Sequence, residues 1–137
     1  MEEIKIKLKP WGKEIWFAET EKYAGKIIEI LKGNRNSLHF HEVKHETLYI
    51  DEGSIKIIYG IDSKNLQEKI LYKGDKFIIA PYTIHRLQAI EDSKIFEVST
   101  PELNDLVKLE DDYGRKGKGL NEELDKELHL ASKSTNN

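Results

Sequence analysis

Short runs of alternating apolar and polar residues, separated by turns, dominate the first hundred residues. Residues 3–8 alternate isoleucine or leucine with lysine, which predicts a half-buried strand with the apolar side chains on one face. The same kind of run recurs nine times, at residues 14–18, 26–31, 37–40, 46–50, 54–59, 68–72, 76–80, 85–90 and 94–99. No helical periodicity separates these runs, so the pattern predicts an all-β sandwich or barrel.

The composition changes after Pro101. Residues 102–109 are compatible with a short helix or an extended arm, and residues 113–119 (YGRKGKG) predict a flexible basic loop. We therefore expect residues 1–100 to form the β-barrel. Residues 101–137 are expected to form a C-terminal arm and helix that belong to the same domain.

One amphipathic helix is predicted near the C-terminus. Leu120, Leu124 and Leu128 recur every four residues with charged residues between them. The helix is expected to open at Asn121 or just before it, because asparagine is a good N-cap. Residues 132–137 are expected to fray.

The composition is that of a soluble globular protein of one ordinary domain. The chain has 137 residues, 38% hydrophobic and 34% charged. The net charge of −3 does not indicate the basic surface that is typical of nucleic-acid-binding proteins. No apolar run approaches the roughly 20 residues that span a bilayer. The charged, alternating N-terminus is not typical of a signal peptide, so we expect a cytoplasmic protein with no membrane partner.

Potential metal ligands cluster between residues 33 and 53. His39 and His41 are two residues apart, so both imidazoles leave the same face of a strand. Glu46 follows, whereas His45 is adjacent to Glu46 and should face away from it. The chain has no cysteine, so any metal must bind nitrogen and oxygen ligands, which suit Zn, Fe, Mn or Ni. The alternative is a pair of surface histidines on a polar strand.

The spacing of these residues resembles a known motif. Five residues separate Gly33 from the HxH pair, four separate His41 from Glu46, and six separate Glu46 from Gly53. This is similar to the first motif of the cupin superfamily, G-x5-H-x-H-x3,4-E-x6-G.

A second segment is similar to the second cupin motif, roughly G-x5-P-x-G-x2-H. It runs from Gly74 to His85, with an extra residue before Pro81 and one residue fewer before the histidine. The resemblance implies a double-stranded β-helix, also called a jelly-roll or cupin barrel. It also implies one divalent metal ion held by four residues, His39, His41, Glu46 and His85.

The resemblance extends over residues 10–100. The segments PWG, GNRNSLHFH and TIHRL look like the cupin domain of type II mannose-6-phosphate isomerases. Those domains usually have glutamine where this chain has His39. The resemblance implies a metal-dependent isomerase of a sugar or sugar phosphate in carbohydrate metabolism, with a small carbohydrate as its ligand.

Four residues beside the motifs are candidates for substrate binding. Arg35 and Arg86 would form an anion clamp near the mouth, or else surface cations in salt bridges. Tyr49 and Tyr82 would line the same cavity, or else pack elsewhere. No catalytic base is identified. Two alternative functions therefore stay open: a metal-containing cupin that binds a sugar without turnover, and an Fe(II) dioxygenase-type cupin.

The two tryptophans and His129 are expected to have structural roles and no role in the metal site. Trp11 and Trp16 are expected to anchor the core or to contact a second copy of the chain. Because sheets seldom leave apolar edges bare, the apolar N-terminal strand also predicts a homodimer. His129 lies in the C-terminal helix and is expected to face solvent.

Overall fold

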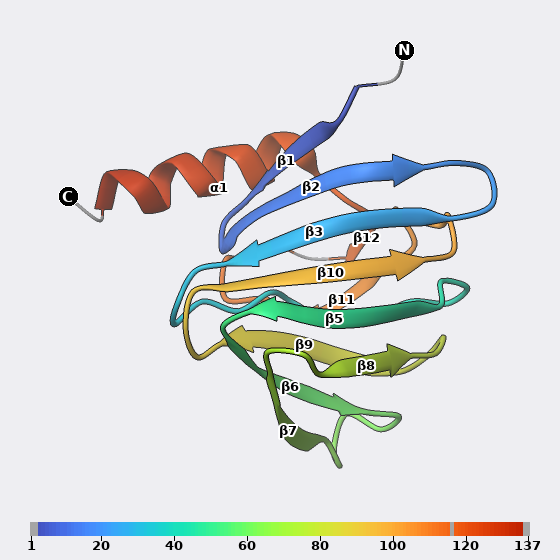
Figure 1. Cartoon of the computed structure of the whole chain (residues 1–137). Helices are drawn as coiled ribbons and strands as arrows, with labels where there is room; N and C mark the ends of the chain where they lie inside the picture. The colour runs from blue at the N-terminus through green and yellow to red at the C-terminus, as the bar shows by residue number, and fades with distance from the viewer. Residues whose placement is uncertain (1–2, 116, 136–137) are drawn as a thin grey trace.

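The computed structural model of the chain describes residues 3–115 and 117–135, and the side chains as far as residue 132. Two antiparallel sheets of six strands face each other (Figure 1). In order across the first sheet, the strands are β1 (Lys5–Lys9), β2 (Gly12–Glu19), β3 (Ala24–Ile30), β10 (Ser93–Ser99), β5 (Glu46–Glu52) and β8 (Lys76–Ile79). Across the second they are β12 (Gly117–Lys118), β11 (Val107–Glu110), β4 (Leu38–Phe40), β9 (Ile84–Ala89), β6 (Ser54–Gly60) and β7 (Gln67–Tyr72).

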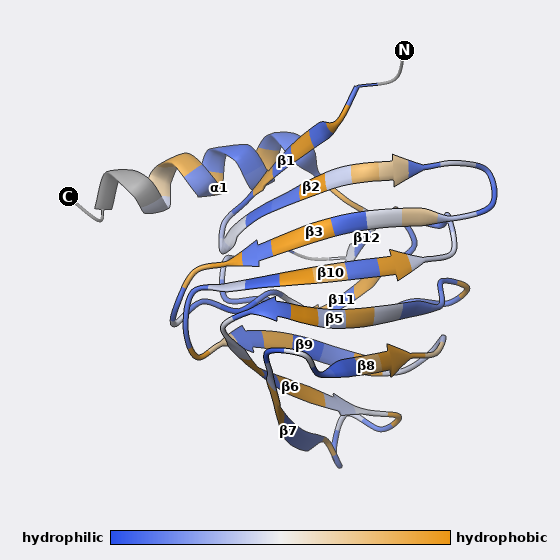
Figure 2. Ribbon diagram, in the orientation of Figure 1, coloured by the Kyte–Doolittle hydropathy of each residue, from blue (hydrophilic) through white to orange (hydrophobic). Residues whose placement is uncertain are grey.

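The predicted all-β jelly roll is confirmed. Each of the ten strands expected in the first hundred residues is present within two residues of its predicted bounds. The core lies between the sheets, because side chains alternate between the two faces of a strand. On β6, for example, Ile55 and Ile57 are fully buried while Lys56 between them is not. Figure 2 shows hydrophobic and hydrophilic stretches following one another along β3 and β10.

The inward face of β1 was predicted wrongly. Ile4 and Ile6 are 63% and 60% exposed, whereas Lys9 is buried. At the end of the strand Lys9 turns inward and pairs with a carboxylate, its Nζ lying 2.8 Å from Asp125 of the C-terminal helix, while Lys5 stays exposed. Ion pairing therefore decides the orientation of this edge strand against its hydrophobic pattern.

The C-terminal segment is an arm that extends the second sheet. Of the two structures predicted for residues 102–109, the extended one is present, since β11 pairs with β4. In the loop predicted to be flexible at 113–119, Arg115 is instead held in place, because its guanidinium is buried against Asp111 and Asp125. Residue 116 of this loop lies outside the described residues.

The chain ends in α1 (Glu122–Thr135), which lies beside β1 (Figure 1). Its predicted N-cap is confirmed, since Asn121 Oδ1 accepts a hydrogen bond from the Leu124 backbone N–H at 3.1 Å. Residues 132–135 were predicted to fray, but the helix continues through them to Thr135. Residues 136 and 137 lie outside the described residues. No helix among the described residues is long and apolar enough to span a bilayer.

His129 was also predicted wrongly. It is only 8% exposed, and its Nδ1 lies 2.8 Å from the carbonyl oxygen of Lys9 and 3.0 Å from that of Gly12. It therefore ties α1 to the turn between β1 and β2. Trp11 and Trp16 are buried within this chain, as core anchors, and so offer little surface to a second copy.

Candidate metal centre

Three histidines meet on the inner face of the second sheet. His39 lies on β4, His41 directly follows β4, and His85 lies on β9 opposite His39. Their ring centroids are 4.3 to 5.3 Å apart, and their ligand nitrogens lie within 4.8 Å of one another. All three side chains are buried. The three histidines therefore form a site that can hold one divalent metal ion.

Each imidazole is oriented by a backbone carbonyl. The Nδ1 atoms of His39 and His85 lie 2.9 Å from the carbonyl oxygens of Ser37 and Thr83, and Nδ1 of His41 bonds the carbonyl of Asp105. A carbonyl only accepts, so Nδ1 carries the proton and Nε2 keeps a free lone pair. This is how metal-binding histidines are held in known sites.

The environment keeps the imidazoles of His39 and His41 neutral. Burial lowers the pKa of His39 well below its usual value, and the neighbouring His85 and His41 lower it further. Burial also lowers the pKa of His41, to about 4, although the charge of Glu46 opposes this. Metals bind neutral imidazole, so these two rings need not lose a proton at neutral pH.

Glu46 has the position and charge of a fourth ligand. Its carboxylate oxygens lie 3.4 Å from His85 Nε2 and 3.6 Å from His41 Nε2. Two ligand atoms 2.1 Å from a tetrahedral ion would be about 3.4 Å apart. Burial alone would raise the pKa of Glu46, but Lys44 and the histidines hold it well below the usual value. Its buried Oε2 also lies 2.9 Å from Lys44 Nζ, so the carboxylate is held in its ionised form beside the histidines. The donor set therefore fits a divalent cation.

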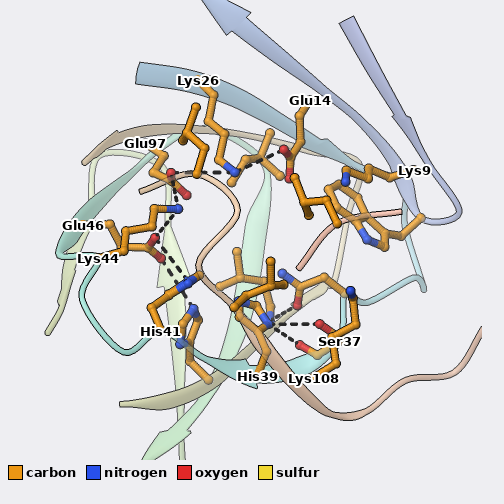
Figure 3. A pocket seen from close by; sticks show the side chains of 18 of the residues that line it. Lys9, Glu14, Lys26, Ser37, His39, His41, Lys44, Glu46, Glu97 and Lys108 are labelled. Atoms are coloured by element: carbon orange, nitrogen blue, oxygen red, sulfur yellow. Dashed lines mark hydrogen bonds and ion pairs between the residues drawn. The ribbon is translucent and has the colours of Figure 1, made fainter. Parts of the chain in front are cut away.

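A row of buried charges crosses the first sheet and ends at this site; we call it the charge ladder. It consists of Glu14 on β2, Lys26 on β3, Glu97 on β10, Lys44 in the loop before β5, and Glu46 (Figure 3). Successive N–O distances along it are 3.1, 3.8, 2.9 and 2.9 Å. Sequence reasoning missed it, although a charged residue two positions from buried apolar ones, such as Lys26 before Ile28, was a usable signal.

The carboxylates of the charge ladder are tuned differently. Burial would raise the pKa of Glu14, but Lys26 and Lys9, with a hydrogen bond from Trp16, lower it to about 2. For Glu97, burial and the charge of Glu46 raise the pKa, and the nearby lysines do not fully offset them. Glu97 is therefore the ladder carboxylate that most readily takes up a proton.

These side chains line a cavity of about 60 Å³ between the two sheets. Five residues of the C-terminal segment also line it: Leu103, Leu106, Lys108, Arg115 and Leu120. Since one water needs about 10–15 Å³, the space holds an ion with a few waters. Sites for small organic molecules usually enclose roughly 300 Å³ or more. A whole sugar does not fit unless the arm moves.

No protein-family model matches the sequence, and no curated protein is significantly similar to it. The fold, however, is similar to that of KdgF from Halomonas sp., with a TM-score of 0.63 and 20% identity over 74% of this chain and 87% of that chain. It is also similar to oxalate decarboxylase from Bacillus subtilis, with a TM-score of 0.67 and 19% identity over 78% of this chain and 30% of that chain. The chain has the cupin fold.

A third similar structure is the oxalate decarboxylase of Lactobacillus farciminis, with a TM-score of 0.65 and 21% identity over 77% of this chain and 33% of that chain. The chain thus spans about a third of each oxalate decarboxylase. The cupin fold confirms the broad resemblance seen in the sequence motifs. The narrower resemblance to type II mannose-6-phosphate isomerases stays a prediction.

The two candidate arginines lie outside the cupin cavity. Arg35 makes a two-pronged ion pair with Asp112 of the arm, at 2.7 and 2.8 Å. Arg86 is buried, and its Nε donates to the carbonyl of Asn36 at 2.9 Å. Arg86 follows His85 directly, so it leaves the opposite face of β9. Both arginines therefore form the salt bridges that were the alternative to an anion clamp, since Arg86 also lies 3.9 Å from Asp112.

The two candidate tyrosines are also outside the cavity. Tyr49 lies between the buried Leu48 and Ile50, so it points outward and is 44% exposed. Tyr82 is 59% exposed, stacks on Phe40, and has a left-handed backbone with φ of 64°. His45 is exposed, as its position beside Glu46 predicts.

Proposed function

We propose that this cupin is a metal-dependent isomerase of a sugar or sugar phosphate, with His39, His41, His85 and Glu46 as metal ligands. The observation that carries the proposal is the convergence of three buried imidazoles on an ionised carboxylate. Three neutral ligands and one carboxylate would leave a divalent ion with a net charge near +1. A bound ion would supply Lewis-acid polarisation of a substrate carbonyl or hydroxyl.

Isomerisation of a sugar also needs a group that accepts a proton from one carbon and returns it to the next. We assign this role to Glu97. It lines the cavity, and its buried Oε2 lies 2.9 Å from Lys44 Nζ, which also contacts Glu46. Its raised pKa contrasts with the lowered pKa of Glu46. Two carboxyl groups tuned in opposite directions are typical of sites that divide ligand and acid–base roles.

The narrow cavity supports one alternative function. Because it holds an ion and a few waters, a metal-containing cupin that binds a sugar at its mouth without turnover also fits the geometry. The identity of the metal distinguishes the isomerase and the sugar-binding cupin from the Fe(II) dioxygenase-type alternative. Only the dioxygenase-type function requires a redox-active ion.

Elemental analysis tests the metal centre directly. Protein purified without an affinity tag or added metal should contain about one equivalent of Zn, Fe, Mn or Ni. The His39→Ala, His85→Ala double variant should lose it, and the exposed control His45→Ala should keep it. A folded wild-type protein that contains no metal and does not bind added ions would contradict the proposed metal-dependent function.

Turnover tests the assignment of Glu97. With mannose 6-phosphate as the first substrate tried, the wild type should interconvert aldose and ketose. Glu97→Gln should keep its metal but lose turnover by roughly 100-fold or more. Unchanged turnover in this variant would exclude Glu97 as the proton-transfer group.

A homodimer and a cytoplasmic location stay predictions. The exposed Ile6 on the edge strand β1 and Ile4 just before it are candidates for a dimer contact, whereas both tryptophans are buried. Light scattering at micromolar concentration would decide the oligomeric state, and a monomeric mass would reject the dimer.

A further inference from the structure

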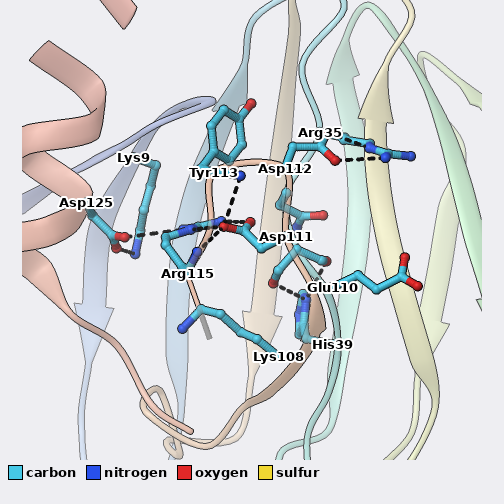
Figure 4. Close-up of polar contacts among 12 residues, drawn as sticks. Lys9, Arg35, His39, Lys108, Glu110, Asp111, Asp112, Tyr113, Arg115 and Asp125 are labelled. Carbon is cyan, nitrogen blue, oxygen red and sulfur yellow. Dashed lines mark hydrogen bonds and ion pairs between the residues drawn. The ribbon is translucent and has the colours of Figure 1, made fainter. Parts of the chain in front are cut away.

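Lys108 lies directly opposite His39 in the antiparallel pair of β11 and β4. Residues opposite each other in a sheet point to the same face, with Cβ atoms roughly 5 Å apart. Both side chains accordingly line the cupin cavity. Figure 4 shows the Lys108 ammonium extending away from His39, so the arm adds an ammonium group to the cavity lining at a distance from the histidine ring.

No carboxylate of the described residues forms an ion pair with Lys108. Its Nζ donates to the carbonyl of Gly119 at 2.6 Å. Within the described part of the chain, the other cavity-lining cations all form ion pairs: Lys9 with Asp125, Lys26 with Glu14, Lys44 with Glu46 and Arg115 with Asp111. An ammonium has three N–H donors, so Lys108 keeps two for a ligand.

The surrounding charges favour an anion at this place. Of the three cations at this end of the cavity, Lys9 pairs with Asp125 and Arg115 with Asp111, and only Lys108 has no carboxylate within ion-pair distance among the described residues. Burial lowers the pKa of Lys108, and the charge of Arg115 lowers it further. A half-buried cation short of a counterion gains from an anionic ligand.

We propose that Lys108, supported by the charge of Arg115, binds the carboxylate or phosphate group of the substrate while its reacting end lies at the histidines. This inference rests on the proposed function and narrows it to an anionic sugar, either a sugar acid or a sugar phosphate. The assignment replaces Arg35 and Arg86, which pair elsewhere, as the source of the anion contact.

Titration calorimetry on the metal-loaded full chain tests the subsite with three probes: mannose 6-phosphate, glucuronate and mannose. Lys108→Gln should weaken binding of the anionic probe about 10- to 100-fold, as expected for a lost hydrogen bond to a charged group. Binding of mannose should not change. The probe that responds tells whether the anion is a phosphate or a carboxylate.

Two further variants keep the test decisive. Lys118→Gln on the neighbouring β12 is the matched control, because Lys118 is 77% exposed and should not affect any probe. Lys108→Arg keeps the charge and should retain most of the anion affinity. Metal content and circular dichroism of each variant exclude a folding defect.

The outcomes separate this inference from the proposed function. Anion binding that depends on Lys108 without any turnover would support the subsite and count against the isomerase. Turnover of an anionic sugar with unchanged KM in Lys108→Gln would overturn the subsite alone. Equal affinity of the wild type for mannose and the anionic probes would also overturn it.

Discussion

The backbone carbonyl of Asp105 accepts a hydrogen bond from Nδ1 of His41. The carboxylate of Asp105 also accepts hydrogen bonds from three consecutive backbone N–H groups, at residues 42–44, with distances of 2.7 to 3.2 Å. One residue of the arm thus orients a histidine of the candidate metal centre and holds the loop that leads to Glu46. The arm is therefore part of the site's support as well as its cover.

We expect Asp105→Ala to weaken metal binding about 10- to 100-fold, because the loop between His41 and Glu46 loses three hydrogen bonds. Competition with a chelator of known affinity measures the change. Asp112→Ala is the control, since Asp112 lies on the same arm but pairs with Arg35 outside the cavity. Equal affinities of the two variants would show that Asp105 has no special role in positioning the site.

Lys44→Met should destabilise the metal-free protein by about 3–5 kcal/mol, because it leaves Glu46 and Glu97 as buried charges without their shared partner. Urea denaturation measures the free energy of unfolding. Metal should recover part of the loss by giving Glu46 a new cation. The exposed Lys64→Met serves as the control and should change stability little. A cost for Lys44→Met below about 1 kcal/mol would contradict the charge ladder.

The lowered pKa of Glu14 predicts how the free energy of unfolding depends on pH. Its pKa falls from an ordinary value of 4.5 to about 2 in the folded state, so the folded state holds the proton less tightly than the unfolded one. The contribution, about 3 kcal/mol, is complete above pH 4.5 and is lost as pH falls toward 2.

Glu14→Gln should therefore be less stable than the wild type at pH 6, and the two should converge as the pH approaches 2. Urea denaturation between pH 6 and pH 3 gives the comparison. Glu68→Gln, whose side chain is 61% exposed, should run parallel to the wild type throughout. A constant gap between wild type and Glu14→Gln would contradict the lowered pKa.

The arm should open when a sugar binds, because the cavity of about 60 Å³ is too small for one. Amide hydrogen exchange tests this. In the metal-loaded protein, β11 should exchange faster than the central strands β5 and β6, since polar contacts and few fully buried side chains hold the arm. A bound anionic sugar should change exchange in β11 and leave β6 unaffected. Exchange in β11 as slow as in β6 would argue against opening.

The sequence by itself determined the strands and the histidine pair. Alternation with a period of two placed His39 and His41 on one face, and the burial along β5 and β6 follows the same period. The same alternation places Glu46 on the inner face with Leu48 and Ile50. These features depend on local backbone geometry, which neighbouring residues specify.

Only the tertiary structure decided what surrounds that pair. His85 lies opposite His39 because β9 pairs with one edge of β4. Lys108 lies opposite His39 in the register because β11 pairs with the other edge of β4. Hydrophobic patterning treats lysine as a surface residue, so it could not predict the burial of Lys9 or Lys44. Their burial requires carboxylates from strands and helices distant in sequence, and only the register of the folded chain brings those partners within reach.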